Sequence, residues 1–478
     1  MIRTPPKVRG SLLVRTALGL TLALGVAGLA ASPALAAKEK PKKEEAAGAL
    51  KLKLTKEFAP KADAALKAWM AAKARPDVAA AQAQLKAAET ALLAASTKSA
   101  QKTAQATYDT AQSALLALVK PEVDGFSALV PGIVSNDDRY QAGAIGLDIG
   151  LFTQSQTIQR QAIEMQLASG FVAAKSIPAY NYYVGKFAYG AKEYMVARAA
   201  LEKATAGGYH DGEADRYLAE TYFAQNDGPG GLAVLKSANE LAKTENRAVS
   251  QQALQRGLSV ANDALILDGV GYFGAELVRA KPSADSWQQA LYALRRVGKY
   301  DKFVLLDAAR LMDRTASYGN GTDYMEYIQI GNNLGLPKEV LRAIDAGIAA
   351  GKLSRSDVSV VDYTTQANAR VQTDTRQGLL AGYDRDARLP TAKVATVLGA
   401  GDSFLSYGQP AKAEEFYQIA LTKPGVDAAE ALTRLGIAQY DQGKYAEAQA
   451  TFAKVAGPRA PLAMFWAVQA GIKAKPAG

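Results

Sequence analysis

Apolar residues recur at helical spacing along most of the chain, separated by short polar breaks. Leu85, Leu92 and Leu93 follow this spacing early in the sequence, and Tyr108 and Leu115 follow it again. From residue 137 onward, segments of roughly 10–16 residues alternate with Gly, Pro or Asp breaks, and runs that alternate apolar with polar residues are missing. The pattern predicts an all-α chain. Helices this short cannot bury a core alone, so they must pack against their neighbours.

The segment 61–120 is rich in alanine and predicts an antiparallel helical hairpin. Its turn is expected within 94–101, where Ser and Thr provide a helix stop and an N-cap. Small alanine faces would let the two helices approach closely. The following segment, 121–178, is also predicted to be helical.

A spaced set of small and aromatic residues stands near the C-terminus. Its members are Leu432, Leu435, Gly436, Tyr440, Gly443, Tyr445, Ala448, Phe452 and Pro458. Gly436 and Ala448 are small where two helices would cross closely, and Gly443 supplies a positive φ at the end of the first helix. About 35 residues upstream the pattern returns, as Gly401, Gly408, Ala413, Tyr417, Ala420 and Pro424.

Two further sets begin near Gly185 and Trp287, with Lys192 standing where the first of them would have its turn glycine. This pattern resembles the tetratricopeptide repeat (TPR), a helix–turn–helix unit of about 34 residues. Leu432 departs from it, because that position usually holds a large aromatic residue. The resemblance implies an α-solenoid of TPR-like repeats over about 179–457, whose first helices line a concave face.

The first 36 residues have the features of an export signal. A basic start leads into an apolar run over 17–31, and the small residues of Ala34-Leu35-Ala36 follow. We expect cleavage after Ala36 and export to the bacterial periplasm. The alternative is an uncleaved anchor, although the run is short for a membrane span of about 20 residues. No later segment predicts a stable membrane span.

The predicted organisation therefore has six parts. They are a signal peptide (1–36), a charged flexible tether (37–60), the Ala-rich hairpin (61–120), a helical segment (121–178), the TPR-like solenoid (179–457), and a C-terminal helix with a tail (458–478).

Composition narrows the chemistry. The net charge of +10, from 56 basic and 46 acidic residues, is mild and spread out, so no nucleic-acid partner is expected. The chain has no cysteine and a single histidine, His210. Disulfides, Cys-bound metals and multi-His metal sites are therefore excluded within one chain. We expect no cofactor and no metal, and we expect His210 to be a surface-turn residue.

Two glycine-rich fragments resemble cofactor or catalytic motifs. The Gly-x-Gly-x-x-Gly over 269–274 resembles a dinucleotide site, but its surroundings lack a strand–helix–strand unit, and we interpret it as a tight turn between helices. The Gly-Ala-Gly-Asp-Ser-Phe over 399–404 resembles the signature of ribokinase-like sugar kinases. The alternating core of that family does not follow, so Gly401 is expected at a helix crossing and Asp402 in a groove.

A third fragment, Tyr140 to Leu147 with Glu122 upstream, faintly resembles lytic transglycosylases. In that family a catalytic Glu is followed by Ser, whereas Val123 follows Glu122 here. The general acid also needs a protected pocket that raises its pKa. A helix N-terminal acid is therefore the preferred interpretation of Glu122.

The repeat resemblance implies which residues line the concave face. They are Tyr182, Lys186, Tyr189, Tyr292, Arg295, Arg296, Asp402, Leu405, Ile437 and Tyr440. Tyr and Arg are favoured where a partner is gripped. The sequence thus predicts a non-catalytic periplasmic scaffold that binds a protein or peptide of the cell envelope. A peptidoglycan-active enzyme of the lytic transglycosylase type and an envelope glycan-binding module are the alternatives.

Overall fold

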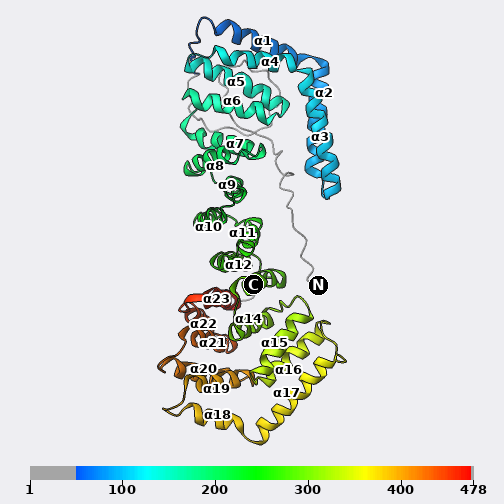
Figure 1. Ribbon diagram of the computed structural model, residues 1–478. Coiled ribbons are helices and arrows are strands. Elements are labelled where there is room, and N and C mark those ends of the chain that lie inside the picture. Colours follow the sequence, from blue (N-terminus) through cyan, green and yellow to red (C-terminus); the bar gives the residue numbers. More distant parts are fainter. Residues whose placement is uncertain (1–49, 475–478) are drawn as a thin grey trace, which may run out of the picture. The chain divides into compact units, whose positions relative to one another are not determined.

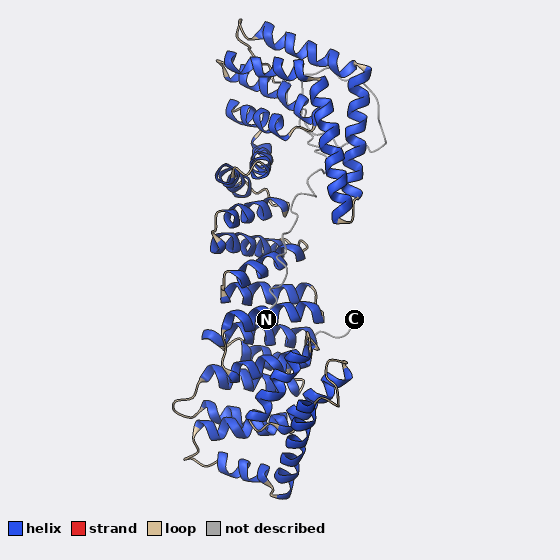
Figure 2. Cartoon of the chain, turned by 45° about the vertical axis from the view of Figure 1, so that its right-hand side comes forward, coloured by secondary structure: helices blue, strands red, loops and turns tan. Residues whose placement is uncertain are grey.

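The computed structural model describes residues 50–474. The predicted signal peptide, residues 37–49 of the predicted tether and the last four residues lie outside this range. Within it the chain forms 23 α-helices and no strand (Figures 1 and 2), which confirms the all-α prediction. Most consecutive helices pack against each other, as an α-solenoid requires. None of the helices between residues 50 and 474 combines the length and apolar character needed to cross a bilayer.

The chain divides into two compact units, one ending at Thr221 and the other beginning at Tyr222. Unit 1 contains α1 (Ala59–Ala74), α2 (Pro76–Ala94), α3 (Lys98–Leu118), α4 (Lys120–Leu129), α5 (Asn136–Thr153), α6 (Gln156–Ser169), α7 (Ile177–Gly190), α8 (Tyr194–Ala206) and most of α9 (Glu213–Ala224). Unit 2 contains α10 (Gly228–Thr244), α11 (Gln251–Asp263), α12 (Leu267–Ala280), α13 (Ala284–Gly298), α14 (Lys302–Thr315), α15 (Gly321–Asn333), α16 (Pro337–Ala349), α17 (Val358–Arg376), α18 (Leu379–Ala387), α19 (Val394–Ser406), α20 (Pro410–Leu421), α21 (Ala428–Asp441), α22 (Tyr445–Phe452) and α23 (Ala460–Ala474).

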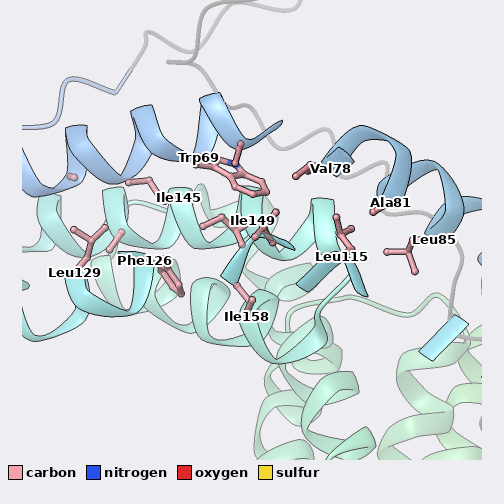
Figure 3. Packing of buried hydrophobic residues seen from close by; sticks show 14 of the residues in the cluster. Trp69, Val78, Ala81, Leu85, Leu115, Phe126, Leu129, Ile145, Ile149 and Ile158 are labelled. Carbon is pink, nitrogen blue, oxygen red and sulfur yellow. The ribbon is translucent and has the colours of Figure 1, made fainter. Parts of the chain in front are cut away.

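The core of unit 1 forms where α1, α4 and α5 meet (Figure 3). Trp69 is fully buried there, and its indole Nε1 donates to Asp148 Oδ2 at 2.7 Å. The segment 61–120 holds α1 as well as the packed pair α2 and α3. The predicted turn region holds both features: α2 ends at Ala94, and the side chain of Thr97 caps the start of α3 by accepting from the backbone N–H of Ala100.

The end of the predicted flexible tether is ordered. The backbone N–H of Lys53 donates to Asp137 Oδ1 at 2.8 Å, and that of Thr55 donates to Asp138 Oδ1 at 2.9 Å. Phe58 is buried in the core of unit 1. Composition alone suggested a frayed segment over 37–60, but the carboxylates of the first turn of α5 hold residues 53–55 in place. The prediction of a flexible tether is therefore wrong for this part.

Each of the four sequence repeats falls on a pair of consecutive helices: α7–α8, α13–α14, α19–α20 and α21–α22. At the crossing of α21 and α22, a Cβ on Gly436 would lie 2.5 Å from Phe452 Cε1, so any larger residue would require the Phe452 ring to move. Gly443 has a φ of 77° at the end of α21, as predicted. Lys192, at the equivalent turn after α7, adopts a φ of 64° despite its side chain.

Replacing Gly443 with alanine is expected to lower the free energy of unfolding by about 1–2 kcal/mol, because alanine pays a steric cost at positive φ. The matched control is Gly399→Ala inside α19, where a Cβ would meet no atom within 4 Å. That variant should gain about 0.5–1 kcal/mol. Urea denaturation of both variants measures the effects, and a loss of stability in the control alone would contradict the assignment of these turns.

Unit 2 folds back on itself. An outgoing leg, α10–α16, is joined through α17 and α18 to a returning leg, α19–α23 (Figure 1). The returning leg packs on the outgoing leg in reverse order, as α19 on α16, α21 on α14 and α23 on α12. In each contact the returning leg contributes the first helix of a pair, or the final helix α23, and the outgoing leg contributes the second helix of a pair.

The Gly-x-Gly-x-x-Gly fragment lies inside α12, so its interpretation as a turn is wrong. Two of its three glycines instead make room for α23. A Cβ on Gly271 would lie 3.1 Å from Pro461 Cβ, and a Cβ on Gly274 would lie 2.6 Å from Phe465 Cζ. The motif therefore marks the place where α23 packs against α12.

Candidate functional site

The residues predicted to line the concave face, called the groove residues below, fall in three separate places. In unit 1, Tyr182 and Lys186 on α7 converge on Glu213 at the start of α9. The Tyr182 hydroxyl donates to Glu213 Oε2 at 2.8 Å, and Lys186 Nζ donates to the same oxygen at 3.3 Å. Lys186 also lies over the rings of Tyr182 and Tyr217. Tyr189, which is also on α7, contacts Tyr217 on α9. The structure therefore brings Tyr182, Lys186 and Tyr189 into one cluster around Tyr217.

The charges of this cluster are mutually satisfied. Burial opposes ionisation of Glu213, but Lys186 and the Tyr182 hydroxyl outweigh burial and lower the pKa of its carboxyl. Burial, together with Glu213, raises the pKa of the Tyr182 hydroxyl. Tyr182 is itself buried, so it supports the cluster and presents little surface to a partner.

In unit 2, Tyr292, Arg295 and Arg296 lie together on α13 but differ in their surroundings. Tyr292 is 59% exposed. Arg295 is paired with Asp323 at 3.1 Å and with Glu326, both on α15. Arg296 Nη1 donates to the backbone carbonyl of Asn262 near the end of α11, at 3.0 Å. The two arginines therefore tie α13 to its neighbours, and the tyrosine is the free side chain of the three.

The remaining predicted groove residues, Asp402, Leu405, Ile437 and Tyr440, belong to the returning leg. All four are less than a tenth exposed. The outgoing leg contacts α19 and α21, and Tyr440 packs against Tyr445 and Trp466 of the returning leg itself, so these residues do not line an open groove in this structure.

Asp402 belongs to a buried ion cluster that sequence reasoning missed. Arg310 on α14 is fully buried and forms a bidentate pair with Glu339 on α16, with N–O distances of 2.8 and 3.1 Å. Its Nη1 also lies 3.1 Å from Asp307 Oδ1 and 3.4 Å from Asp402 Oδ1. Burial by itself would raise the pKa of Glu339, but Arg310 outweighs burial and lowers that pKa to about 2.

The returning leg supplies two further cations to this cluster. Arg434 on α21 lies 2.9 Å from Asp402 Oδ2 and 2.7 Å from Glu430 Oε1, both through Nη1. Arg459, just before α23, reaches Asp307 Oδ2 at 2.9 Å. The cluster thus joins α14, α16, α19, α21 and the start of α23. A sequence signal existed, because Asp307 and Arg310 fall on one helical face within an apolar run.

The other motif residues have structural positions. Gly401 lies inside α19 against Tyr417, and the Tyr417 hydroxyl donates to Asp402 Oδ1 at 2.8 Å. Glu122 lies in the first turn of α4, as the helix N-terminal interpretation predicts. The Tyr140–Leu147 fragment lies inside α5. His210 lies in the loop before α9, and its Nδ1 is 3.0 Å from Oδ1 of Asp215 in the first turn of α9.

A surface hollow of about 450 Å³ in unit 1 also escaped the sequence analysis. Arg160 on α6 lies in its wall, 2.9 Å from Glu164 and 2.8 Å from Glu193. The hydrogen bond to Glu193 is the main cause of a raised pKa for the Arg160 guanidinium. Because Glu193 is 33 residues away along the chain, no local pattern reveals this pair.

Across residues 50–474, no group of three or more His, Asp or Glu side chains is placed to hold a metal ion. Comparison with known proteins adds no family: neither a protein-family model nor a curated protein matches the chain. The site must therefore be interpreted from its own residues.

Proposed function

We propose that the chain is a non-catalytic scaffold of TPR-like helical repeats, exported to the periplasm, that binds a protein or peptide partner through the face of α13. The exposure of Tyr292 carries this proposal. At 59% it is more exposed than any other aromatic residue that the structure describes. An exposed tyrosine offers apolar area with a polar tip, a combination common at the centres of protein interfaces.

The packing of unit 2 supports the choice of this face. The returning leg covers α12, α14 and α16, which are the second helices of their pairs. The first helix α13 meets the returning leg through Trp287, which packs edge-on against Phe465 of α23, while Tyr292 stays exposed. Gln288 and Gln289, one turn before Tyr292, are exposed as well and offer amide donors and acceptors beside the ring. Arg295 and Arg296 hold α13 in place, so Tyr292 stands on a rigid support.

Replacing Tyr292 with alanine is expected to weaken binding of the envelope partner about tenfold or more, because a central tyrosine contributes on the order of 2 kcal/mol to an interface. The fold should be unaffected, since the ring is mostly in solvent. Val358→Ala, at another strongly exposed position of unit 2, is the matched control and should bind like the wild type.

The experiment places a photoreactive amino acid at position 292 or at position 358 and irradiates each variant with envelope extract. A partner crosslinked from 292 and not from 358, whose affinity falls on Tyr292→Ala, supports the proposal. Equal crosslinking from both positions, or equal affinity of wild type and Tyr292→Ala, would refute it.

A further inference from the structure

The ion cluster between the two legs of unit 2 carries one more negative than positive charge. Its cations are the three arginines Arg310, Arg434 and Arg459, and its anions are the four carboxylates Asp307, Glu339, Asp402 and Glu430. A neighbouring layer, in which Arg314 and Arg342 face Asp313 and Asp441, is balanced. An uncompensated charge in a buried site is costly, so the cluster favours the uptake of one positive charge.

Of the four carboxylates, Glu430 has the fewest contacts with hydrogen-bond donors and cations. Asp307, Glu339 and Asp402 each accept from two or more donors, and Glu339 has a bidentate arginine. Glu430 has one close cationic contact, Arg434 Nη1, and shares that nitrogen with Asp402. Arg434 is 1% exposed, and its Nε and Nη2 have no hydrogen-bond partner among the described residues.

The charged groups that act on Glu430 come from several elements. They are Arg434 on its own helix, Asp307 on α14, Asp402 on α19 and Arg459 before α23. Arg310 on α14, Glu339 on α16 and Tyr417 on α20 complete the cluster through their contacts with one another or with Asp307 and Asp402. The side chain of Glu430 is 16% exposed, so a proton from solvent can reach it without opening the cluster.

We propose that this cluster binds one proton, at Glu430, and that the bound proton tightens the packing of the returning leg against α14. Protonation removes the excess negative charge while the second carboxyl oxygen still accepts from Arg434. The contacts of Asp307, Glu339 and Asp402 with their arginines are kept. Mild acidity therefore closes unit 2 more firmly.

The direction in which pH changes the stability of unit 2 follows from the surroundings of Glu430. Burial raises the pKa of the Glu430 carboxyl, and Arg434 and Arg459 offset this only in part. A carboxyl with a raised pKa binds more protons in the folded state than in the unfolded state. Its contribution to stability is therefore present at low pH and is lost as the pH rises through the raised pKa.

Glu430→Gln mimics the protonated form and tests the proposal. Its melting temperature should exceed that of the wild type by about 2–4 °C at pH 7.5, and the difference should shrink as the pH falls through the raised pKa of Glu430. Glu414→Gln on α20 is the matched control, because Lys444 and two glutamines outweigh burial and lower the pKa of its carboxyl. That variant should melt below the wild type at both pH values.

Hydrogen–deuterium exchange of the wild type gives a second readout that needs no variant. After correction for intrinsic exchange rates, α14, α21 and α23 should be better protected at pH 5.5 than at pH 7.5, while α5 and α6 of unit 1 serve as the internal reference. A Glu430→Gln variant that is destabilised equally at both pH values, or protection of α21 that does not rise at low pH, would overturn the proposal.

Discussion

Arg310→Met should destabilise unit 2 by about 3–5 kcal/mol, because it leaves the buried Glu339 without its bidentate arginine and takes one of two cations from Asp307 and from Asp402. Asp307 and Glu339 are at most 1% exposed, and Asp402 is 8% exposed, so water cannot replace the guanidinium. Methionine is similar in length and leaves little cavity, which isolates the charge effect. The measurement is chemical denaturation followed by the fluorescence of Trp287 and Trp466, which both lie in unit 2.

Arg385→Met is the matched control. Arg385 on α18 has a side chain 76% exposed and, within residues 50–474, pairs only with its neighbour Asp386, so its replacement should change stability by less than about 0.5 kcal/mol. Adding Glu339→Gln to Arg310→Met removes one of the stranded charges and should recover part of the loss. Equal effects of the two single replacements would mean that the cluster does not hold the legs together.

Trp466→Ala should lower the free energy of unfolding by a similar amount, about 3–5 kcal/mol, because it removes the largest side chain of α23 from a fully buried position. The indole stacks on Phe452 at 5.9 Å between ring centroids and meets Tyr440 edge-on at 5.4 Å. Its Nε1 donates to the backbone carbonyl of Asp307 on α14, at 3.1 Å. The replacement should therefore loosen the returning leg from the outgoing leg.

Hydrogen–deuterium exchange checks this effect locally. Protection should fall in α12, α14 and α23 and stay unchanged in unit 1. Met464→Ala, a 39% exposed position on the same helix, is the control and should cost far less. If protection falls only within α23 itself, the indole contributes to its own helix and not to the contact between the legs.

The helices and their pairing could be predicted because local constraints determine them. Gly436 and Gly443 mark a close crossing and a turn with positive φ, and both follow from backbone geometry alone. The ordered end of the tether could not be predicted from composition. It depends on Asp137 and Asp138, which lie more than 80 residues away along the chain.

The fold-back of unit 2 could not be predicted from the sequence. The first helix of a repeat has the same pattern of residues on its outer face whether that face binds a partner or packs against another part of the chain. Ile437 and Tyr440 match groove positions of the repeat, yet both are buried in the structure. The residues that would have signalled this are charged ones in apolar helices, such as Arg310 and Arg434. Such residues are buried only when partners from distant helices surround them.

The claim that unit 2 folds back on itself has a direct test, because the chain contains no cysteine. Gly271 and Pro461 are 190 residues apart in sequence, yet a Cβ on Gly271 would lie 3.1 Å from Pro461 Cβ. This is about 0.7 Å shorter than the mean Cβ separation of about 3.8 Å in a disulfide, so the two side chains are near enough to be bridged. On mild oxidation, the double variant Gly271→Cys/Pro461→Cys should form an intramolecular disulfide in nearly every molecule, seen as a faster-migrating monomer on a non-reducing gel. Free thiols after oxidation, or disulfides only between molecules, would contradict it.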